Sequence, residues 1–311
     1  MPVAALAQAR AQRPLIAFLD GKSQAAGQAL THAFLQGLRE FGYEPGRNLE
    51  IVYRFADGRD ERLPGMAAEL VRLKPSVIIA PGVNAVVAAH NVTKTIPILS
   101  WALADAIHLG LAKSYAQPGG NVTGITPYVD GLPAKQLELA REIVPAATKV
   151  GILGNMNDPK APPQRQELED AARSLKVEAV FSELRNPDGL EAAVRALASE
   201  RVRVVIVLQT EMTLSERRGI ATAALANGLP TVFGYRENVA DGGLVSYGVS
   251  LRWCSHRLAG YVHKVLQGAS PAGLPIELPT KLELVANART AKALGLSIPK
   301  QLAMRSDEVI E

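Results

Sequence analysis

The sequence has a single cysteine, Cys254, among 311 residues, and this excludes an internal disulfide and any zinc site built from cysteine pairs. We interpret Cys254 as a small buried apolar residue rather than a nucleophile. No segment approaches the roughly 20 apolar residues that a membrane-spanning helix needs. No more than two Lys or Arg residues are adjacent, so the basic blocks typical of nucleic-acid binding are missing too. We therefore expect neither membrane insertion nor nucleic-acid binding.

Signature motifs of catalysis are missing as well. Gly21-Lys22-Ser23 resembles the end of a phosphate-binding loop, but Ile16 stands where such a loop needs a glycine. The sequence holds no GxGxxG, GxSxG or HExxH motif, and its five histidines are scattered along the chain. We therefore predict that the chain is not an enzyme and that it carries no cofactor and no metal.

The composition itself is that of a globular protein. Apolar residues make up 48% of the chain and charged residues 21%, with a formal net charge of +4 and only 5% aromatic residues. At roughly 150 residues per domain, the length predicts two domains, each large enough to bury a core.

Short apolar runs alternate with helical patterns along the whole chain. The first five runs lie at residues 15–19, 49–55, 77–80, 96–99 and 122–125. After a helical pattern at 132–144 the alternation starts again, with runs at 149–153, 178–181, 202–208, 230–233 and 244–247, and a last strand–helix unit at 282–294. Strands that alternate with helices in this way indicate parallel sheets with helices on both faces. We therefore predict an α/β fold with two Rossmann-like, doubly wound parallel sheets.

Ligands of open parallel sheets bind beyond the carboxyl ends of the strands, so the residues that follow each predicted strand are the candidates for a site. Many of them are polar or aromatic, which suits a small organic solute with an apolar or aromatic body. Strand ends are also ordinary polar surface loops, and that alternative stays open for each residue. The predicted ligand-binding residues are Asp20, Ser23, Asn84, Trp101, Asp105, Tyr128, Asn155, Gln209, Tyr235, Arg236, Glu237 and Tyr247.

Six stretches of the chain resemble the substrate-binding proteins of bacterial ABC transporters, of the tryptophan/tyrosine type. Together they span nearly the full length after residue 13. The last two stretches, GYRENVADGGLVSYG and LPTKLELVANARTAKALGLSIPKQLAMRSDEVIE, are the most specific to the family. The matching stretches are Phe34–Gly58, Leu63–Ala80, Gln117–Ile125, Lys135–Leu153, Gly234–Gly248 and Leu278–Glu311.

The resemblance implies a type I periplasmic-binding fold, in which a three-segment hinge joins two lobes. Crossovers are expected near residues 126–131, 244–248 and 276–280. The N-terminal lobe would comprise residues 13–126 and 245–276, and the C-terminal lobe residues 127–244 and 277–311. Residues 1–12 would be the remainder of a secretion signal.

The resemblance further implies a soluble, monomeric periplasmic receptor that binds an amino acid or another aromatic or carboxylate-bearing compound and delivers it to a cognate permease. The lobes would close on the solute like a flytrap. Because Cys254 is the only cysteine, no lipid-anchored cysteine is expected near the N-terminus.

Within that picture, the expected ring contacts are Trp101 and Tyr235. The expected polar contacts are Asp20, Asn84 and Asp105 in one lobe, and Asn155, Gln209 and Arg236 in the other. Arg236 could hold a ligand carboxylate through its planar guanidinium, or it could form a structural ion pair with Glu237 or another carboxylate.

One departure from the family and two other functions stay open. Ala106 stands where relatives usually have a proline after the aspartate, and this could change the shape of the cleft. The same scaffold also serves as the ligand-sensing domain of repressors, or as an enzyme, for which Asp20 and Asp105 would be the only plausible acid–base pair.

Overall fold

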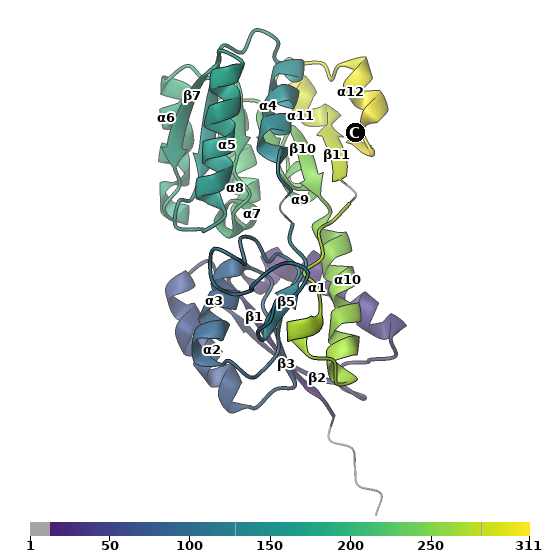
Figure 1. Ribbon diagram of the computed structural model, residues 1–311. Coiled ribbons are helices and arrows are strands. Elements are labelled where there is room, and N and C mark those ends of the chain that lie inside the picture. The colour runs from purple at the N-terminus through teal and green to yellow at the C-terminus, as the bar shows by residue number, and fades with distance from the viewer. Residues whose placement is uncertain (1–12, 128, 281) are drawn as a thin grey trace, which may run out of the picture.

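The computed structural model describes residues 13–127, 129–280 and 282–311. Within these residues the strands form two sheets, one of five strands in the order β2-β1-β3-β4-β5 and one of seven in the order β12-β11-β10-β9-β8-β6-β7. Each sheet forms the centre of its own lobe (Figure 1). The strands are β1 (Leu15–Asp20), β2 (Glu50–Phe55), β3 (Val77–Ile79), β4 (Ile98–Ser100), β5 (Val122–Gly124), β6 (Lys149–Gly154), β7 (Glu178–Glu183), β8 (Val205–Val207), β9 (Thr231–Phe233), β10 (Val245–Val249), β11 (Leu282–Asn287) and β12 (Glu308–Ile310).

Helices cover both faces of each sheet. In the first lobe they are α1 (Gln24–Glu40), α2 (Leu63–Arg72), α3 (Val83–Val92) and α10 (Leu251–Leu266). In the second lobe they are α4 (Leu132–Ile143), α5 (Ala161–Ser174), α6 (Leu190–Ser199), α7 (Glu211–Ser215), α8 (Arg217–Ala226), α9 (Arg236–Ala240), α11 (Ala288–Ala293) and α12 (Lys300–Arg305). None of the helices in the described part of the chain is long and apolar enough to cross a bilayer.

The central strands are continuous apolar runs because both of their faces are buried. In β1, Ile16 and Phe18 point into the core under α1 and α10, whereas Ala17 and Leu19 point into the core under α2 and α3. Successive side chains of a strand alternate between the two faces, so a strand with helices on both sides has no polar face. The prediction of an α/β fold with two doubly wound sheets is confirmed.

The second sheet differs from the prediction in one respect. Strands β10 and β11 pair antiparallel, whereas the remaining pairs of this sheet are parallel. The last strand, β12, and the helix α12 before it were not predicted, because the apolar stretches in residues 300–311 are only two and three residues long.

The chain passes between the lobes three times. It crosses between β5 and α4, between β10 and α10, and between the turn that ends at Gly273 and β11. The outgoing and returning segments lie side by side, since Ile125 and Glu277 form a bridge and the Thr126 N–H donates to the Glu277 carbonyl at 3.0 Å. Residues 245–249, which we expected in the first lobe, belong to the second sheet as β10, since they pair with β9 and β11.

Helices α1 and α10 pack closely against each other, because Gly37 of α1 has no side chain at the point of contact. A Cβ atom on Gly37 would lie 2.5 Å from the His256 carbonyl oxygen and 2.8 Å from the Ala259 Cβ. Both distances are shorter than ordinary van der Waals contact, and one of them involves backbone that cannot move alone. The missing side chain at Gly37 therefore allows α10, which the chain enters on its return from the second lobe, to pack closely against α1.

We predict that Gly37→Ala destabilises the protein, because overpacking of a tight core contact typically costs about 1–3 kcal/mol. The matched control is Gly65→Ala in α2, where an added Cβ has no atom within 4 Å. Alanine there is expected to be neutral or to stabilise the helix by up to about 1 kcal/mol. Urea unfolding followed by circular dichroism measures both, and equal effects of the two substitutions would contradict the prediction.

Candidate ligand-binding site

The two lobes meet where strands of both sheets end. Asp20 is the last residue of β1, Gly82 caps the N-terminus of α3 after β3, and Glu211 opens α7 after β8. Helix α7 lies at the edge of the second lobe that faces the first (Figure 1). A Cβ atom on Gly82 would overlap the carboxylate of Glu211, so a side chain of the second lobe rests directly on first-lobe backbone.

Glu211 is fixed at this position by the way α7 begins. The Thr210 hydroxyl accepts from the Thr213 N–H at 3.1 Å, and the Thr213 hydroxyl accepts from the Thr210 N–H at 3.1 Å. This reciprocal cap starts the helix at Glu211. The Glu211 N–H in turn donates to Asp158 Oδ2 at 3.0 Å.

Buried charges of both lobes surround this contact. In the first lobe Lys22 and Asp20 form an ion pair of 2.8 Å and are 3% and 0% exposed. In the second lobe Lys160 and Asp158 lie 3.6 Å apart and are equally buried. Charges are buried at this level only when they are paired or when a ligand completes them.

Three carboxylate oxygens of the cluster are buried without a hydrogen-bond partner: Asp20 Oδ2 and both oxygens of Glu211. Burial raises the pKa of the Glu211 carboxyl to about 7, an increase that Lys22 opposes and Asp20 reinforces. Burial alone would lower the pKa of the Lys22 ammonium, but Asp20 and Glu211 outweigh it and the pKa is raised. The cluster is therefore short of hydrogen-bond donors and of positive charge.

Asp60 is a further acidic group of the first lobe at this place. Its Oδ2 accepts from the Asn84 side-chain amide at 2.7 Å, and its Oδ1 lies 3.3 Å from the position that a Cβ of Gly21 would take. The carboxylate of Glu211 approaches that same position. Burial, and the negative charges of Asp158 and Glu61, raise the pKa of Asp60 despite the Asn84 hydrogen bond and Lys22.

Aromatic side chains lie beneath the charges. Trp101 is 1% exposed, with ring centroids 5.8 Å from Phe18 and 5.7 Å from Phe34. Tyr235 and Leu214 of the second lobe belong to the same apolar cluster. Burial, aided by Asp158, raises the pKa of the Tyr235 hydroxyl, which therefore stays neutral.

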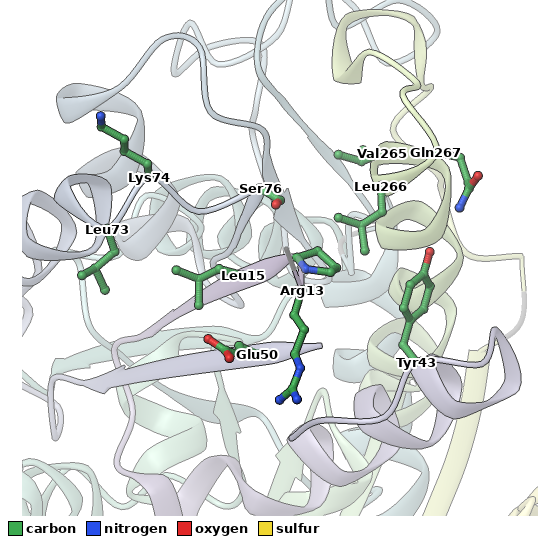
Figure 2. Close-up of a pocket in the computed structure, with 11 residues that line it drawn as sticks. Arg13, Leu15, Tyr43, Glu50, Leu73, Lys74, Ser76, Val265, Leu266 and Gln267 are labelled. Carbon is green, nitrogen blue, oxygen red and sulfur yellow. The ribbon is translucent and has the colours of Figure 1, made fainter. Parts of the chain in front are cut away.

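Two cavities differ in their relation to the lobe boundary. One of about 540 Å³ lies between the lobes, lined by Asp105 and Tyr115 of the first lobe, Lys160 and Pro163 of the second, and Asp130 of the segment that crosses between them. A larger one, of about 1020 Å³, is open at the opposite end of the first sheet, where Leu15 and Glu50 begin their strands (Figure 2). Parallel sheets bind ligands at the carboxyl ends of their strands, so only the smaller cavity is at the expected place.

Comparison with known proteins identifies the family. A family model described as ABC transporter substrate binding protein matches residues 16–310. This chain belongs to that family. The observed two-lobed fold, with charged and aromatic groups between the lobes, is consistent with a protein that binds small solutes.

Individual relatives of this substrate-binding protein are similar over most of its length. A tyrosine-binding protein of Clostridioides difficile is 28% identical over 278 residues, which is 88% of this chain and 80% of the relative. A conserved domain protein of Vibrio cholerae is 27% identical, with a TM-score of 0.90 over 96% of this chain and 100% of its own. A Streptococcus pneumonia protein in complex with L-Trp is 22% identical, with a TM-score of 0.89 and the same coverage.

Several of the predicted ligand-binding residues come together at the lobe boundary. Asp20 and Asn84 contribute from the first lobe, to the Lys22 ion pair and to the Asp60 hydrogen bond. Asn155 and Gln209, both 4% exposed, are at the ends of their second-lobe strands. Trp101 and Tyr235, the expected ring contacts, belong to one apolar cluster and are 1% and 4% exposed.

Other predicted residues have structural partners. Ser23 caps α1, its hydroxyl accepting from the Ala26 N–H at 3.2 Å. Arg236 pairs with Glu308 through two hydrogen bonds of 2.7 Å, so the second of the two roles considered for it is the one observed. Asp105 accepts from the His108 ring at 2.5 Å and lines the cavity between the lobes.

The last three predicted residues lie elsewhere. Glu237 lies in the first turn of α9. Burial raises the pKa of its carboxyl, and one carboxyl oxygen is buried without a hydrogen-bond partner. Tyr247 is half-buried and packs against the cores of both lobes, as suits a residue in a hinge strand. Tyr128 lies outside the described residues.

Sequence reasoning did not select five residues of the charged cluster. Lys22 and Glu211 follow predicted strands and could have been chosen by the same rule as Asp20. Asp60 lies beyond the second predicted strand, after which no ligand-binding residue was predicted. The remaining two, Asp158 and Lys160, lie three or more residues beyond Asn155 in a turn that the sequence does not mark. Within the described part of the chain, no group of three or more His, Cys, Asp or Glu side chains is arranged to hold a metal.

The raised pKa of Glu211 predicts a specific pH dependence of stability. The folded protein binds a proton on Glu211 up to a pH of about 7, whereas the unfolded chain releases it at its ordinary lower pKa. The free energy of unfolding should therefore fall as the pH rises from about 5 to about 8, by on the order of 1–3 kcal/mol for this group.

Glu211→Gln removes that contribution, so its stability relative to the natural protein should increase with pH over the same range. Asp60, Glu237 and Glu283 also have raised pKa values, but they titrate in both proteins and cancel in the comparison. Thermal unfolding of the two proteins at a series of pH values measures the difference. A difference that does not vary with pH would show that Glu211 titrates normally.

Proposed function

We propose that this substrate-binding protein is the extracytoplasmic receptor of an ABC importer, binding a small organic solute between its lobes and delivering it to a cognate permease. The observation that carries the proposal is the buried charged cluster, in which Asp20 and Lys22 of one lobe face Asp158, Lys160 and Glu211 of the other. A cluster that is assembled from both lobes, and lacks donors, is what a solute enclosed between them would complete.

The same cluster supports a mechanism of closure. When the lobes separate, the Glu211 carboxylate and Asp20 gain water as a hydrogen-bond partner, so the open form avoids the cost of burying unpartnered oxygens. A solute that contacts both lobes offsets this cost and shifts the population toward the closed form. The three crossing segments, bridged at Ile125 and Glu277, would be the hinge.

Relatives and buried rings together favour an amino acid or another aromatic compound as the solute. One relative is a tyrosine-binding protein and another was solved with L-Trp. In this chain Trp101 and Tyr235 lie in the apolar cluster beneath the charges, where they could form the wall of a solute pocket as the lobes part. Asp20, Asn84, Asp105, Asn155 and Gln209 remain the proposed polar contacts. Arg236 is not among them, because Glu308 occupies its guanidinium.

The partners follow from this role. The permease would recognise the closed arrangement of the two lobes, and one chain is sufficient to form the site, so we propose a monomer. A receptor of this kind performs no chemistry on its solute.

We predict that the solute closes the lobes, measured as energy transfer between two dyes. Cys254 is buried, so dyes would attach to engineered cysteines at two exposed positions, Arg72→Cys in α2 and Ala192→Cys in α6. Aromatic amino acids, aliphatic amino acids, aromatic acids and purines are screened. One class should raise the energy transfer, together with a thermal stabilisation of about 2.7 kcal/mol at a solute concentration 100-fold above Kd.

The control pair is Arg72→Cys with Lys94→Cys, both exposed and both in the first lobe, where the energy transfer should not change. If no class of solute changes the transfer between the lobes, the receptor function proposed here is wrong.

A further inference from the structure

The contact between the lobes buries one ionisable side chain. Glu211 opens α7 of the second lobe, and its carboxylate overlaps the Cβ position of Gly82 and closely approaches that of Gly21, both in the first lobe. Both carboxylate oxygens are buried, and neither has a hydrogen-bond partner among the described residues. Because first-lobe backbone contributes to this burial, separation of the lobes would expose the carboxylate to water.

Charged side chains of both lobes face Glu211. They are Asp20, Lys22 and Asp60 of the first lobe and Asp158 and Lys160 of the second. Burial has the largest influence on the Glu211 carboxyl and raises its pKa to about 7, an increase that the two lysines oppose and that Asp20 and Asp158 reinforce. Asp60 Oδ1 lies 3.3 Å from the Cβ position of Gly21 that Glu211 also approaches. The ionised form of Glu211 is therefore disfavoured at this place despite two nearby ammonium groups.

The backbone of Glu211 is fixed at the lobe boundary. The cap formed by Thr210 and Thr213 starts α7 at this residue, and the Glu211 N–H donates to Asp158 Oδ2 at 3.0 Å. A carboxylate held in this way can avoid the cost of burial by taking up a proton, because a neutral carboxyl is buried at lower cost than an ion. It can also avoid that cost when the lobes separate. Protonation and opening are therefore alternative ways to relieve the same cost.

We propose that Glu211 is a proton-operated switch of lobe closure: its protonation closes the solute-free protein, and its ionisation keeps the solute-free protein open. The inference rests on the receptor function proposed above and adds a second control of the same closure. The proton acts on the same equilibrium as the solute, since each makes the closed form less costly.

The direction of the pH dependence follows from the two forms. In the open form the Glu211 carboxyl is exposed to water and titrates at its ordinary pKa, whereas in the closed form burial raises the pKa to about 7. Between these two values the closed form binds a proton that the open form releases, so the closed form becomes more populated as the pH falls. The ratio of closed to open protein should rise by up to about tenfold for each pH unit between about 7 and about 5.

This switch has a consequence for transport. In acidic surroundings the empty protein would adopt the closed arrangement that the permease is proposed to recognise. Solute would then enter more slowly, because the closed lobes must open before a solute can reach the space between them.

The test measures energy transfer in the solute-free full chain, with dyes on Arg72→Cys and Ala192→Cys as described above. Unfolding in urea, dialysis and refolding first remove any solute bound during expression. The transfer should increase as the pH is lowered from 8 to 5. In Glu211→Gln, whose neutral amide resembles the protonated carboxyl, most of this increase should be lost, and the transfer should be close to that of the natural protein at pH 5.

Three controls accompany this test. The pair Arg72→Cys with Lys94→Cys, both within the first lobe, corrects for any response of the dyes to pH. Glu216→Gln removes a negative charge from the same lobe, and Asp60→Asn removes the other carboxylate near Gly21; both should keep the increase in transfer.

Gly82→Ala is a second variant, in case Glu211→Gln does not fold. Its added Cβ would take the place of the Glu211 carboxylate, so the side chain could no longer be buried there. The difference in transfer between pH 8 and pH 5 should therefore become smaller. Thermal unfolding verifies that each variant is folded.

Three outcomes overturn the inference: a transfer that does not change with pH in the natural protein, an increase that Glu211→Gln retains in full, or an increase that Asp60→Asn abolishes and Glu211→Gln does not. The receptor function is tested separately, by the solute screen at constant pH. If a solute closes the lobes and acid does not, only the switch fails. If acid closes them and no solute does, only the receptor function fails.

Discussion

The burial of the Glu211 carboxylate between the lobes, with both of its oxygens unpartnered, is the constraint on which the rest of this structure depends. Burying a carboxylate without hydrogen bonds costs free energy, and burial raises the pKa of Glu211 to about 7. Lys22 and Lys160 oppose that increase in pKa, although each is also paired with an aspartate of its own lobe, Asp20 or Asp158. In the receptor function proposed above, a solute that supplies hydrogen-bond donors at this point would offset that cost and favour the closed form.

The rest of the structure fixes the positions of these few charged side chains. Both sheets have helices on each face, and the first-lobe core extends up to Trp101, which is fixed between Phe18 and Phe34 just below the charged layer. In the proposed closure the motion would be confined to the three crossing segments, two of which are bridged at Ile125 and Glu277. The position of Glu211 is then determined by the cap at Thr210 and by Asp158, rather than by a flexible loop.

The apolar runs were sufficient to predict the two sheets, because a strand that is buried on both faces is a continuous apolar run and is easily recognised in the sequence. They could not predict that β11 runs antiparallel, since burial of a strand is the same in either direction. The rule of strand ends found Asp20 and Gln209, but it gave no means to tell a solute contact from a helix cap such as Ser23 or an ion pair such as Arg236 with Glu308. Glu211 also follows a predicted strand and so meets the same rule, but nothing in the sequence shows that its carboxylate reaches the other lobe; its position depends on the cap formed by the Thr210 and Thr213 hydroxyls.

The path of the chain has a consequence for how the molecule is made. Helix α10 completes the first core but lies more than a hundred residues beyond β5, after most of the second sheet has been synthesised. The second sheet in turn waits for β11 and β12 at the very end of the chain. Neither lobe can bury its apolar surface during the early stages of synthesis, so an incomplete chain keeps the faces of α1 and β10 exposed, where they are accessible to chaperones and vulnerable to aggregation.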